Sequence, residues 1–320
     1  MTGGSFIISL DFELFWGVRD KRSKENYSDV IVKVWDVIPK MLELFNKYEI
    51  TATFATVGFL FAEELEDLLK YKPDKLPDYV DANLSPYTKY ISRDSFLDKR
   101  LHFAKSLIEQ IIEHKHEIAT HTFSHYYCLE KGQTLSAFEA DLEAAAQISY
   151  PMNYHSIVFP RNQYNAKSLQ VCHKQGIVAF RGNEKSWVYA TEAQSEEGLF
   201  KRAVRLMDSY MNLTGHHLFV PEKIEGLVNV PASRFLRPYS RSMSWLEPIK
   251  LNRIKNSMTE AARQEKSYHL WWHPHNFGLN TDENFRNLER VAKHYKKLNE
   301  NYGWRNASMR EVAQIHFTNE

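Results

Sequence analysis

Hydrophobic residues follow two alternating patterns along this chain. Short runs rich in β-branched and aromatic residues, such as FIISL at 6–10 and ITATFAT at 50–56, predict buried strands. Longer segments place apolar residues three or four positions apart, which predicts amphipathic helices. In segment 29–47 the apolar positions are Val30, Val34, Val37, Met41, Leu44 and Phe45.

The two patterns alternate along most of the sequence. The predicted strands are 6–10, 50–56, 116–120, 156–159, 177–181, 228–230 and 268–272. The predicted helices are 29–47, 98–114, 135–148, 166–174, 196–211, 249–265 and 282–299. Alternation of this kind is typical of an α/β protein with a parallel sheet. We expect a distorted (β/α) barrel of about seven strands, a single domain over residues 1–320, and a site at the carboxyl ends of the strands.

Segment 71–95 interrupts this alternation. It contains three prolines and shows neither a helical nor a strand period. Two interpretations remain open from the sequence, a lid that covers the substrate and a plain surface insertion.

The composition of the chain indicates which kind of partner it binds and in which cellular compartment it works. The 41 basic and 40 acidic residues nearly cancel, which argues against nucleic acid and favours a small or neutral partner. Cys128 and Cys172 are too few for a disulfide framework and suit a reducing compartment. The N-terminus does not resemble a signal peptide, and no apolar run approaches the roughly 20 residues of a membrane span. We therefore expect a soluble, cytoplasmic protein, whose oligomeric state the sequence leaves open.

Reactive side chains follow several of the predicted strands. They are Asp11 and Glu13 after the first strand, His121 and His125 after the third, Arg161 after the fourth, and His273 and His275 after the last. Random placement would also scatter such residues over helix faces. Their position at strand ends predicts one site that contains carboxylates, imidazoles and a guanidinium.

The spacing of these residues suggests metal-assisted hydrolysis. His121 and His125 are four apart, so one helical turn after Thr120 would place both rings on one face, close enough to hold one ion. Such an ion needs at least one more ligand, commonly a carboxylate. Asp11 and Glu13 are two apart and point to the same side of an extended chain. One can bind the metal while the other acts as the base, and the spacing alone does not decide which.

The remaining polar residues have complementary chemistry. Arg161 could keep the base ionised, since a nearby positive charge favours a carboxylate. His273 or His275 would protonate the leaving group from the other side of the site.

The motifs HTFSH at 121–125, FPRNQ at 159–163 and ITATFATVGF at 50–59, with a late histidine on a strand, resemble a known family. This family is the polysaccharide deacetylases with the NodB homology domain, carbohydrate esterase family four. The similarity extends over about residues 5 to 280, and its most specific element is the H-[ST]-x-x-H box. The resemblance implies a distorted (β/α) barrel, hydrolysis of an acetamide on a glycan, and a divalent metal.

The resemblance also assigns roles to residues. Asp11 matches the catalytic base, His121 and His125 match metal ligands, and Glu13 is expected as the third ligand, although Asp11 and Glu13 could exchange roles. The family usually has two adjacent aspartates here, whereas this chain has Asp-Phe-Glu. Arg161 matches the motif arginine, but the following residues depart from the usual Arg-x-Pro-x-Gly, so the donor to the oxyanion is not located.

The last motif, Leu270-Trp271-Trp272-His273, makes His273 the general acid and leaves His275 as a supporting residue or substrate contact. The aspartate that usually accompanies the acid is missing in its usual form. Glu184 and Trp187 are the nearest match, and Trp187 is our candidate for stacking on a sugar ring.

The function expected from these observations is removal of an N-acetyl group from an acetamido sugar in a glycan or glycan precursor. The cofactor would be one divalent ion, zinc first, with cobalt, nickel, manganese and iron as alternatives. Two other functions remain open, a non-catalytic carbohydrate-binding barrel with a structural metal and an amidohydrolase acting on a non-glycan amide.

Overall fold

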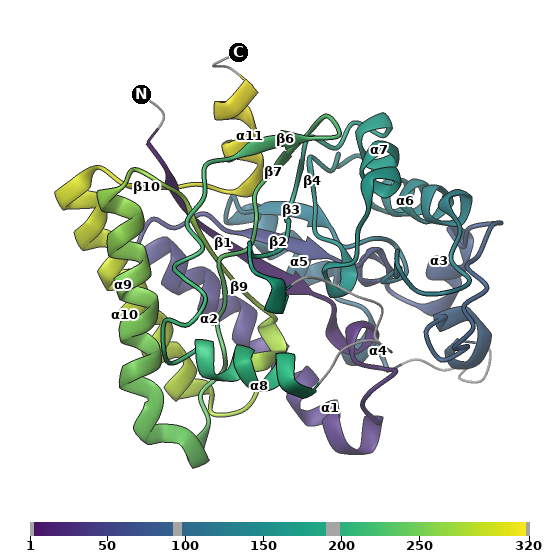
Figure 1. Ribbon diagram of the computed structural model, residues 1–320. Helices are drawn as coiled ribbons and strands as arrows, with labels where there is room; N and C mark the ends of the chain where they lie inside the picture. The colour runs from purple at the N-terminus through teal and green to yellow at the C-terminus, as the bar shows by residue number, and fades with distance from the viewer. Residues whose placement is uncertain (1–2, 92–97, 190–198, 318–320) are drawn as a thin grey trace.

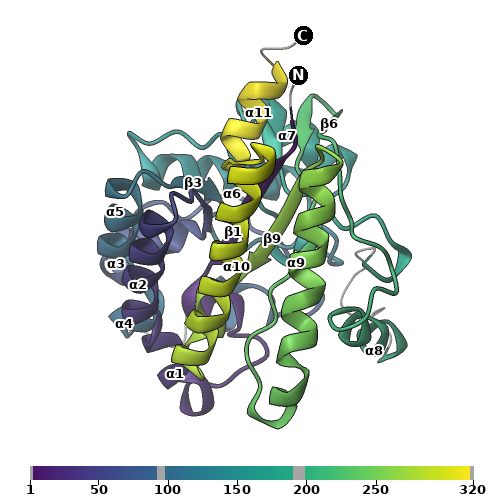
Figure 2. The same cartoon turned by 90° about the vertical axis from the view of Figure 1, so that its left-hand side faces the viewer.

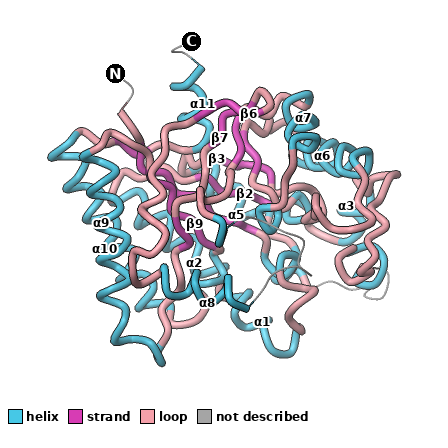
Figure 3. Tube along the Cα trace, viewed as in Figure 1, coloured by secondary structure: helices cyan, strands magenta, loops and turns pink. Residues whose placement is uncertain are grey.

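A curled, mostly parallel sheet forms the centre of the molecule (Figures 1 and 3). The computed structural model describes residues 3–91, 98–189 and 199–317 of the 320-residue chain. Within these ranges the strands are β1 (Ser5–Phe12), β2 (Thr53–Thr56), β3 (Glu117–Thr120), β4 (Ser156–Ile157), β5 (Ala179–Phe180), β6 (Glu222–Ile224), β7 (Leu227–Asn229), β8 (Arg234–Phe235), β9 (Tyr268–Trp272) and β10 (Arg305–Asn306).

The order of the strands shows how the sheet curls. Its path is β6-β7-β5-β4-β3-β2-β1-β9-β8, so β7 and β8 stand near opposite ends. Residues 230–233 join these two strands directly. Val230 donates its backbone N–H to the carbonyl of Phe180, the last residue of β5, and Ser233 donates its N–H to the carbonyl of His269 of β9, both at 2.9 Å. Segment 227–236 therefore bridges the two sides of the sheet. The predicted distorted barrel is confirmed, and β7 and β8 together act as its seventh strand.

Helices cover the outside of the sheet, with α9 and α10 side by side on one flank (Figure 2). Their bounds are α1 (Lys24–Val32), α2 (Val34–Lys47), α3 (Leu65–Lys70), α4 (Lys99–His102), α5 (Lys105–Glu113), α6 (Leu135–Ser149), α7 (Ala166–Lys174), α8 (Leu199–Asp208), α9 (Glu247–Arg263), α10 (Thr281–Tyr302) and α11 (Met309–Phe317). None of the helices in the described ranges is both long enough and apolar enough to cross a membrane.

Most predicted elements are present, and some bounds differ. The predicted helix 98–114 is two helices, because Phe103 and Ala104 leave the helical path and Ala104 donates its N–H to the carbonyl of Leu60 at 2.9 Å. The predicted helix 29–47 is likewise α1 followed by α2. Residues 196–198 of the predicted helix 196–211 lie outside the described ranges, and α8 occupies 199–208.

Small residues fill the inside of the barrel. Ala55, Ala119 and Ala179 belong to one buried cluster with Val158, and α11 adds Met309 to this cluster. Larger side chains such as Leu10 and Phe12 point outward and pack under the helices. The narrow interior explains this division, because alternate residues of each strand face inward. The carboxyl ends of the strands are thereby held rigidly around one centre.

Residues 71–91 form the described part of the predicted insertion. Asp78 and Val80 donate backbone hydrogen bonds to the carbonyls of Gly132 and Lys131 at 3.0 Å, so this segment lies along 131–132. Tyr79 packs against Tyr127 in a small buried cluster. Residues 92–95 lie outside the described ranges. A role as a lid remains a prediction.

Candidate metal centre and active site

The carboxyl ends of β1, β3 and β9 bring together the main predicted site residues. Asp11 is the second-last residue of β1, and Glu13 follows the strand directly. His121 follows β3, and His273 follows β9. Because β1 pairs in parallel with β2 and β9, and β2 pairs with β3, these ends lie on one side of the sheet. The strand order therefore explains why residues so distant in sequence meet.

Glu13, His121 and His125 form a buried group of possible metal ligands. The Oε2 atom of Glu13 lies 3.1 Å from Nε2 of His125 and 3.5 Å from Nε2 of His121. One ligand atom from each residue lies within 4.8 Å of the other two. This is the one group of its kind found in the part of the chain that the structure describes. A carboxylate oxygen and two imidazole nitrogens are a donor set that suits zinc and similar ions.

The Nδ1 atoms of His121 and His125 contact other parts of the protein, and the Nε2 atom of each ring faces Glu13. Nδ1 of His121 lies 2.7 Å from the carbonyl oxygen of Val158, so Nδ1 carries the proton and Nε2 keeps its lone pair. Nδ1 of His125 lies 3.0 Å from the hydroxyl of Tyr127. Partners of this kind orient metal-binding histidines and raise their basicity. These contacts therefore fit a metal site.

The HTFSH segment does not form the helical turn that we predicted. Residues 121–125 are irregular, and both Thr122 and His125 have left-handed backbones, with φ of 64° and 61°. This conformation is uncommon for residues other than glycine and needs support from the surroundings. The two rings still lie close, with centroids 5.1 Å apart. The four-residue spacing thus identified His121 and His125 as neighbours, although the helical turn from which we predicted this is not formed.

Asp141 of α6 holds this irregular segment in place. Its buried carboxylate accepts backbone hydrogen bonds from Phe123 at 2.7 Å and Ser124 at 3.2 Å, and a further bond from the Ser124 hydroxyl. Thr122 accepts from the N–H of Tyr126 at 2.7 Å. The sequence places Asp141 on a predicted helix, and we did not predict this function for it.

Glu13 is packed and charged in a way that suits a ligand. Burial favours its neutral form, but His273, His121 and His125 together hold the pKa of Glu13 well below its usual range. Gly17 makes room for the side chain, because a Cβ at Gly17 would lie 1.9 Å from the carboxyl carbon of Glu13. The carboxylate is therefore ionised, and any larger residue at position 17 would displace it.

Asp11 is paired with Arg181, a residue that we did not predict in the site. The guanidinium donates to both oxygens of Asp11, from Nη1 at 2.6 Å and from Nη2 at 2.9 Å. Ser9 and Asn162 accept further hydrogen bonds from the same group. Burial raises the pKa of Asp11, but Arg181 outweighs this effect and the net shift is downward. The predicted pairing with Arg161 is therefore wrong, and Arg181 is the arginine that keeps Asp11 ionised.

Arg161 lies at the rim of the site. It forms an ion pair with Asp20, and its guanidinium carbon lies 4.2 Å from the centre of the Tyr127 ring. The left-handed backbone of Arg161 and Asn162, with φ of 53° and 54°, separates their side chains. Asn162 turns toward Arg181, whereas Arg161 turns toward Asp20. This backbone conformation is the physical reason why Arg161 pairs with Asp20 and not with Asp11, as we had predicted.

His273 faces both carboxylates. Its Nε2 atom lies 3.5 Å from Oε1 of Glu13 and 3.8 Å from Oδ2 of Asp11, and the side chain is 23% exposed. His275 lies behind it, with ring centroids 4.9 Å apart, and packs edge-on against Tyr27. Burial lowers the pKa of His275 to about 3. The ring of His275 is buried and packs against His273, and its role as a substrate contact remains a prediction.

Trp187 and Trp271 lie in different surroundings. Trp187 belongs to the short helix η5 (Trp187–Tyr189), is 61% exposed, and stacks on Phe200 of α8 with centroids 6.4 Å apart. Its role in substrate binding remains a prediction. Trp271 instead lies beneath Arg181, whose guanidinium carbon is 4.3 Å from the ring centre. Strand alternation could have identified Trp271, since it shares the inward face with His269.

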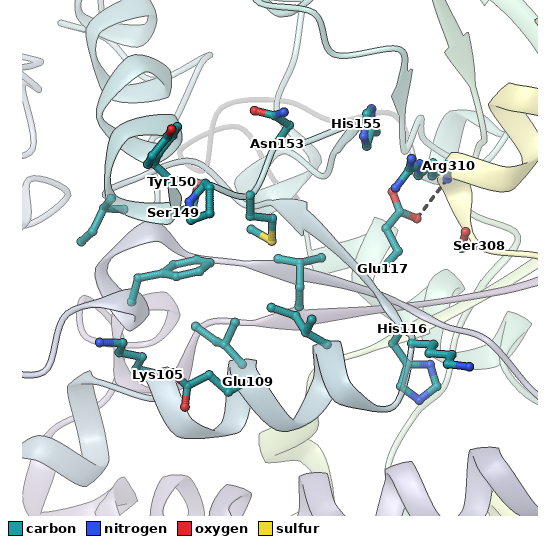
Figure 4. Close-up of a pocket in the computed structure, with 18 of the residues that line it drawn as sticks. Lys105, Glu109, His116, Glu117, Ser149, Tyr150, Asn153, His155, Ser308 and Arg310 are labelled. Atoms are coloured by element: carbon teal, nitrogen blue, oxygen red, sulfur yellow. Dashed lines mark hydrogen bonds between the residues drawn. The ribbon is translucent and has the colours of Figure 1, made fainter.

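A separate cavity of about 960 Å³ lies at the other end of the strands. Figure 4 shows its lining, which includes His116 and Glu117 at the start of β3, Tyr150 after α6, and Arg310 of α11. Barrel enzymes carry out their chemistry at the carboxyl ends of the strands. The carboxylates and histidines of the candidate site lie at the opposite end of β3.

Comparisons with known proteins agree with this architecture. The family model described as polysaccharide deacetylase matches residues 29–180. No curated protein matches the chain by sequence. A solved structure described as a polysaccharide deacetylase from Mycobacterium smegmatis has a TM-score of 0.63 at 11% identity, covering 99% of this chain and 91% of that chain.

Two further structures share the fold. One is described as a polysaccharide deacetylase from Pseudomonas aeruginosa PAO1, with a TM-score of 0.54, 9% identity, and coverage of 99% and 90%. The other is the Puue allantoinase, with a TM-score of 0.55, 8% identity, and coverage of 98% and 89%. The family match contains His121 and His125, whereas Asp11, Glu13 and His273 lie outside it. The resemblance seen in the motifs is confirmed by the polysaccharide deacetylase family match over residues 29–180, and the solved structures share the fold.

Proposed function

We propose that the protein is a metal-dependent hydrolase that removes an N-acetyl group from an acetamido sugar in a glycan or glycan precursor. The polysaccharide deacetylase family match over residues 29–180 supports glycan deacetylation in general. The observation that carries the finer proposal is the buried group of Glu13, His121 and His125, beside a second carboxylate and a histidine. This combination supplies a metal site, a base and an acid within one small volume.

Each residue has a separate task in this mechanism. Glu13, His121 and His125 would hold one divalent ion, zinc first, which when bound polarises the acetamide carbonyl and favours attack by water. Asp11 takes the proton from the attacking water. Arg181 supports this step because its two hydrogen bonds keep Asp11 ionised and fixed in orientation.

His273 is the proposed general acid. It lies across from Asp11 and next to Glu13, and part of its side chain is exposed to the opening of the site. From there Nε2 can give a proton to the departing sugar amine while Asp11 retains the proton of water. Asn276 accepts a hydrogen bond from the backbone N–H of His273 at 3.3 Å and steadies this segment.

The proposed substrate is a precursor made inside the cell, such as a sugar linked to a lipid or a nucleotide. The near-zero net charge of +1 and the two free, buried cysteines, which suit a reducing compartment, support this choice. An amidohydrolase acting on a non-glycan amide is the second candidate, because the proposed base and acid contact only the amide. The allantoinase of similar fold makes cyclic amides sensible members of a substrate panel.

The experiment measures metal content and acetate release on the same preparation. Protein purified without chelator should contain about one divalent ion per chain and release acetate from N-acetylated sugars. Asp11→Ala should keep the ion and lose at least about 100-fold in kcat. If Asp11→Ala keeps full activity, the assigned base is wrong. A metal-loaded protein without activity on sugars or cyclic amides would instead support a non-catalytic binding barrel.

A further inference from the structure

A histidine inside the barrel, His269, has no task in the proposed mechanism. It lies on β9, is fully buried, and faces inward like Trp271 two positions later. Its neighbours Ile7 and Val230 belong to the apolar cluster inside the barrel. A polar ring in such a place costs free energy unless its nitrogen atoms form hydrogen bonds. The partners of His269 therefore indicate what the residue does.

A chain of hydrogen bonds connects His269 to the proposed base Asp11. Nε2 of His269 lies 2.8 Å from the hydroxyl oxygen of Ser9, and Nδ1 lies 3.1 Å from the carbonyl oxygen of Val230. Ser9 accepts a hydrogen bond from Nη1 of Arg181 at 3.0 Å. The same Nη1 atom donates to Asp11 at 2.6 Å. Because Ser9 and Asp11 are two positions apart on β1, both face the interior.

The direction of each hydrogen bond follows from which atoms can donate. The carbonyl oxygen of Val230 can only accept, so Nδ1 of His269 carries the proton and Nε2 has the free lone pair. Arginine can only donate, so Ser9 receives a hydrogen from Arg181 and gives its own to Nε2 of His269. Burial and the charge of Arg181 lower the pKa of His269 to about 3, which keeps the ring neutral. His269 thereby turns a lone pair of the Ser9 oxygen toward Arg181.

The guanidinium of Arg181 uses all four of its Nη hydrogens. Asp11 accepts two of them, and Ser9 and Asn162 accept one each. Without the Ser9 acceptor, one buried Nη1 hydrogen would have no partner, and the guanidinium could turn toward a new one. The orientation of Asp11 therefore depends on Ser9, and through Ser9 on His269.

The bridging segment 227–236 holds His269 from the other side. Ser233 donates its N–H to the carbonyl of His269 at 2.9 Å, and its hydroxyl oxygen accepts from the N–H of His269 at 3.0 Å. Val230, which accepts from the ring, belongs to the same segment. The segment that closes the barrel therefore also sets the position and the tautomer of His269.

We infer that His269 is a positioning residue of the active site, which through Ser9 fixes the guanidinium of Arg181 and thereby the orientation of Asp11. This inference rests on the proposed function, because it takes Asp11 as the base. The alternative is a histidine that only completes the core. Loss of such a residue would lower stability and leave kcat unchanged.

Nitrogen nuclear magnetic resonance of the full, isotope-labelled chain tests the hydrogen bonds and requires no turnover. At about pH 7 the signal of His269, assigned by its absence in His269→Leu, should show the proton on Nδ1. The Nη hydrogens of Arg181 should give separate signals, because their bonds stop the guanidinium from rotating. These signals should merge in Ser9→Ala and in His269→Leu.

Acetate release tests the consequence for catalysis. Ser9→Ala and His269→Leu should each lower kcat by about 10-fold to 100-fold and change KM by less than about threefold, because the base shifts while binding of the sugar is kept. The double variant should lose no more than the larger single loss, since His269 acts through Ser9. His269→Gln should recover kcat to within about fivefold of the parent, because its amide oxygen can accept from Ser9.

The matched control is His116→Leu. His116 is also a buried histidine, and its Nδ1 accepts from the N–H of Ala52 at 3.1 Å, just before β3 and at the end opposite the site. This variant should lower the free energy of unfolding but leave kcat within about twofold of the parent value. Urea unfolding of every variant checks that it folds.

Three results would overturn the inference. They are a proton on Nε2 of His269, unchanged kcat in His269→Leu, and losses that multiply in the double variant. If His269→Leu does not fold, Ser9→Ala decides, because it removes a single oxygen atom, and separate Arg181 signals in that variant would overturn the inference. Failure of the deacetylase proposal would appear differently, as no acetate release by the parent protein although its His269 and Arg181 signals are as expected.

Discussion

Arg181 and Arg161 differ in the carboxylate that each one holds. Arg181 is fully buried and bonded to Asp11, whereas Arg161 pairs with Asp20 at the rim. Arg181→Met should lower the free energy of unfolding by about 3 to 5 kcal/mol, because it leaves a buried carboxylate unpaired. It should also lower kcat by at least about 100-fold, because the base is no longer held ionised.

In the matched variant Arg161→Met, kcat should stay within about threefold of the parent value, since Asp11 keeps its partner Arg181. The free energy of unfolding should fall by less than in Arg181→Met. Urea unfolding and acetate release measure both effects. A larger loss of kcat in Arg161→Met than in Arg181→Met would show that the arginine of the FPRNQ motif does hold the base.

At the residue scale, the sequence predicted the identity of side chains that follow strands but not their pairing. Asp11, Glu13, His121, His125 and His273 were all selected and do converge in the structure. Arg181 was missed although a signal existed, because it lies two positions after the inward-facing Ala179. Its backbone N–H donates to the carbonyl of Ile157, which extends the pairing of β5 with β4 to this residue.

The segment HTFSH depends on an element outside the motif. Asp141→Ala should weaken metal binding by about 10-fold to 100-fold, because the left-handed backbone of Thr122 and His125 loses the carboxylate that anchors it. Competition with a chelator measures the affinity. Glu139→Ala, an exposed position on the same helix, is the control and should leave it unchanged. Equal affinity in both variants would show that the segment holds its shape without α6.

The end of α8 is fixed by Asp208, which predicts a dependence of stability on pH. Burial raises the pKa of Asp208, but the charge of Arg234 and hydrogen bonds from Thr214 outweigh burial and lower it to about 2. A depressed pKa means that Asp208 stabilises the fold above its unfolded pKa of about 3.9 and that this contribution disappears as the pH falls toward 2.

Asp208→Asn should therefore lower the free energy of unfolding by about 3 kcal/mol at pH near 7, and the difference from the parent should shrink between about pH 4 and pH 2. Urea unfolding of the metal-free protein at several pH values measures this. Asp67→Asn removes a surface pair with Lys70 and should change stability by less than about 1 kcal/mol. A difference that stays constant down to pH 2 would contradict the role of Asp208.

At the element scale, periodicity identified the long helices well. Helix α7 and strand β9 have the predicted bounds, and Asn165 caps α7 by accepting from the N–H of Ser168 at 3.0 Å. Strands β6, β8 and β10 were not predicted, and each has only two or three residues. The helical turn expected at 121–125 failed because Asp141, distant in sequence, stabilises a different backbone.

The proposed metal would join segments far apart in the molecule. Its ligands come from the ends of β1 and β3, so the ion would hold both strand ends in place. With free ion at about 100 times Kd, binding should add about 3 kcal/mol to the free energy of unfolding. Removing the ion with a chelator should lower Tm, and added zinc should restore it, as calorimetry would show. The variant His121→Ala should show no such dependence, whereas an equal shift in this variant would place the ion elsewhere.

The whole architecture was predictable because strand and helix patterns alternate over nearly the entire chain. The way in which the barrel closes was not predictable. A single strand was expected at 228–230, but the chain continues from β7 into β8 and pairs with β5 on one side and β9 on the other. This pairing depends on backbone hydrogen bonds of Ser233 and its neighbours, which leave no periodic signature in the sequence.

The bridging segment 227–236 lies between the proposed ligands and His273 in the sequence, so these parts of the site are synthesised at different times. All three proposed ligands lie before residue 126, on strand ends that pair through β2, whereas His273 lies beyond the bridge. A nascent chain could therefore bring Glu13, His121 and His125 together while His273, the proposed general acid, is still within the ribosome. Capture of the ion would then precede closure, and the ion could serve as a template on which the later strands dock.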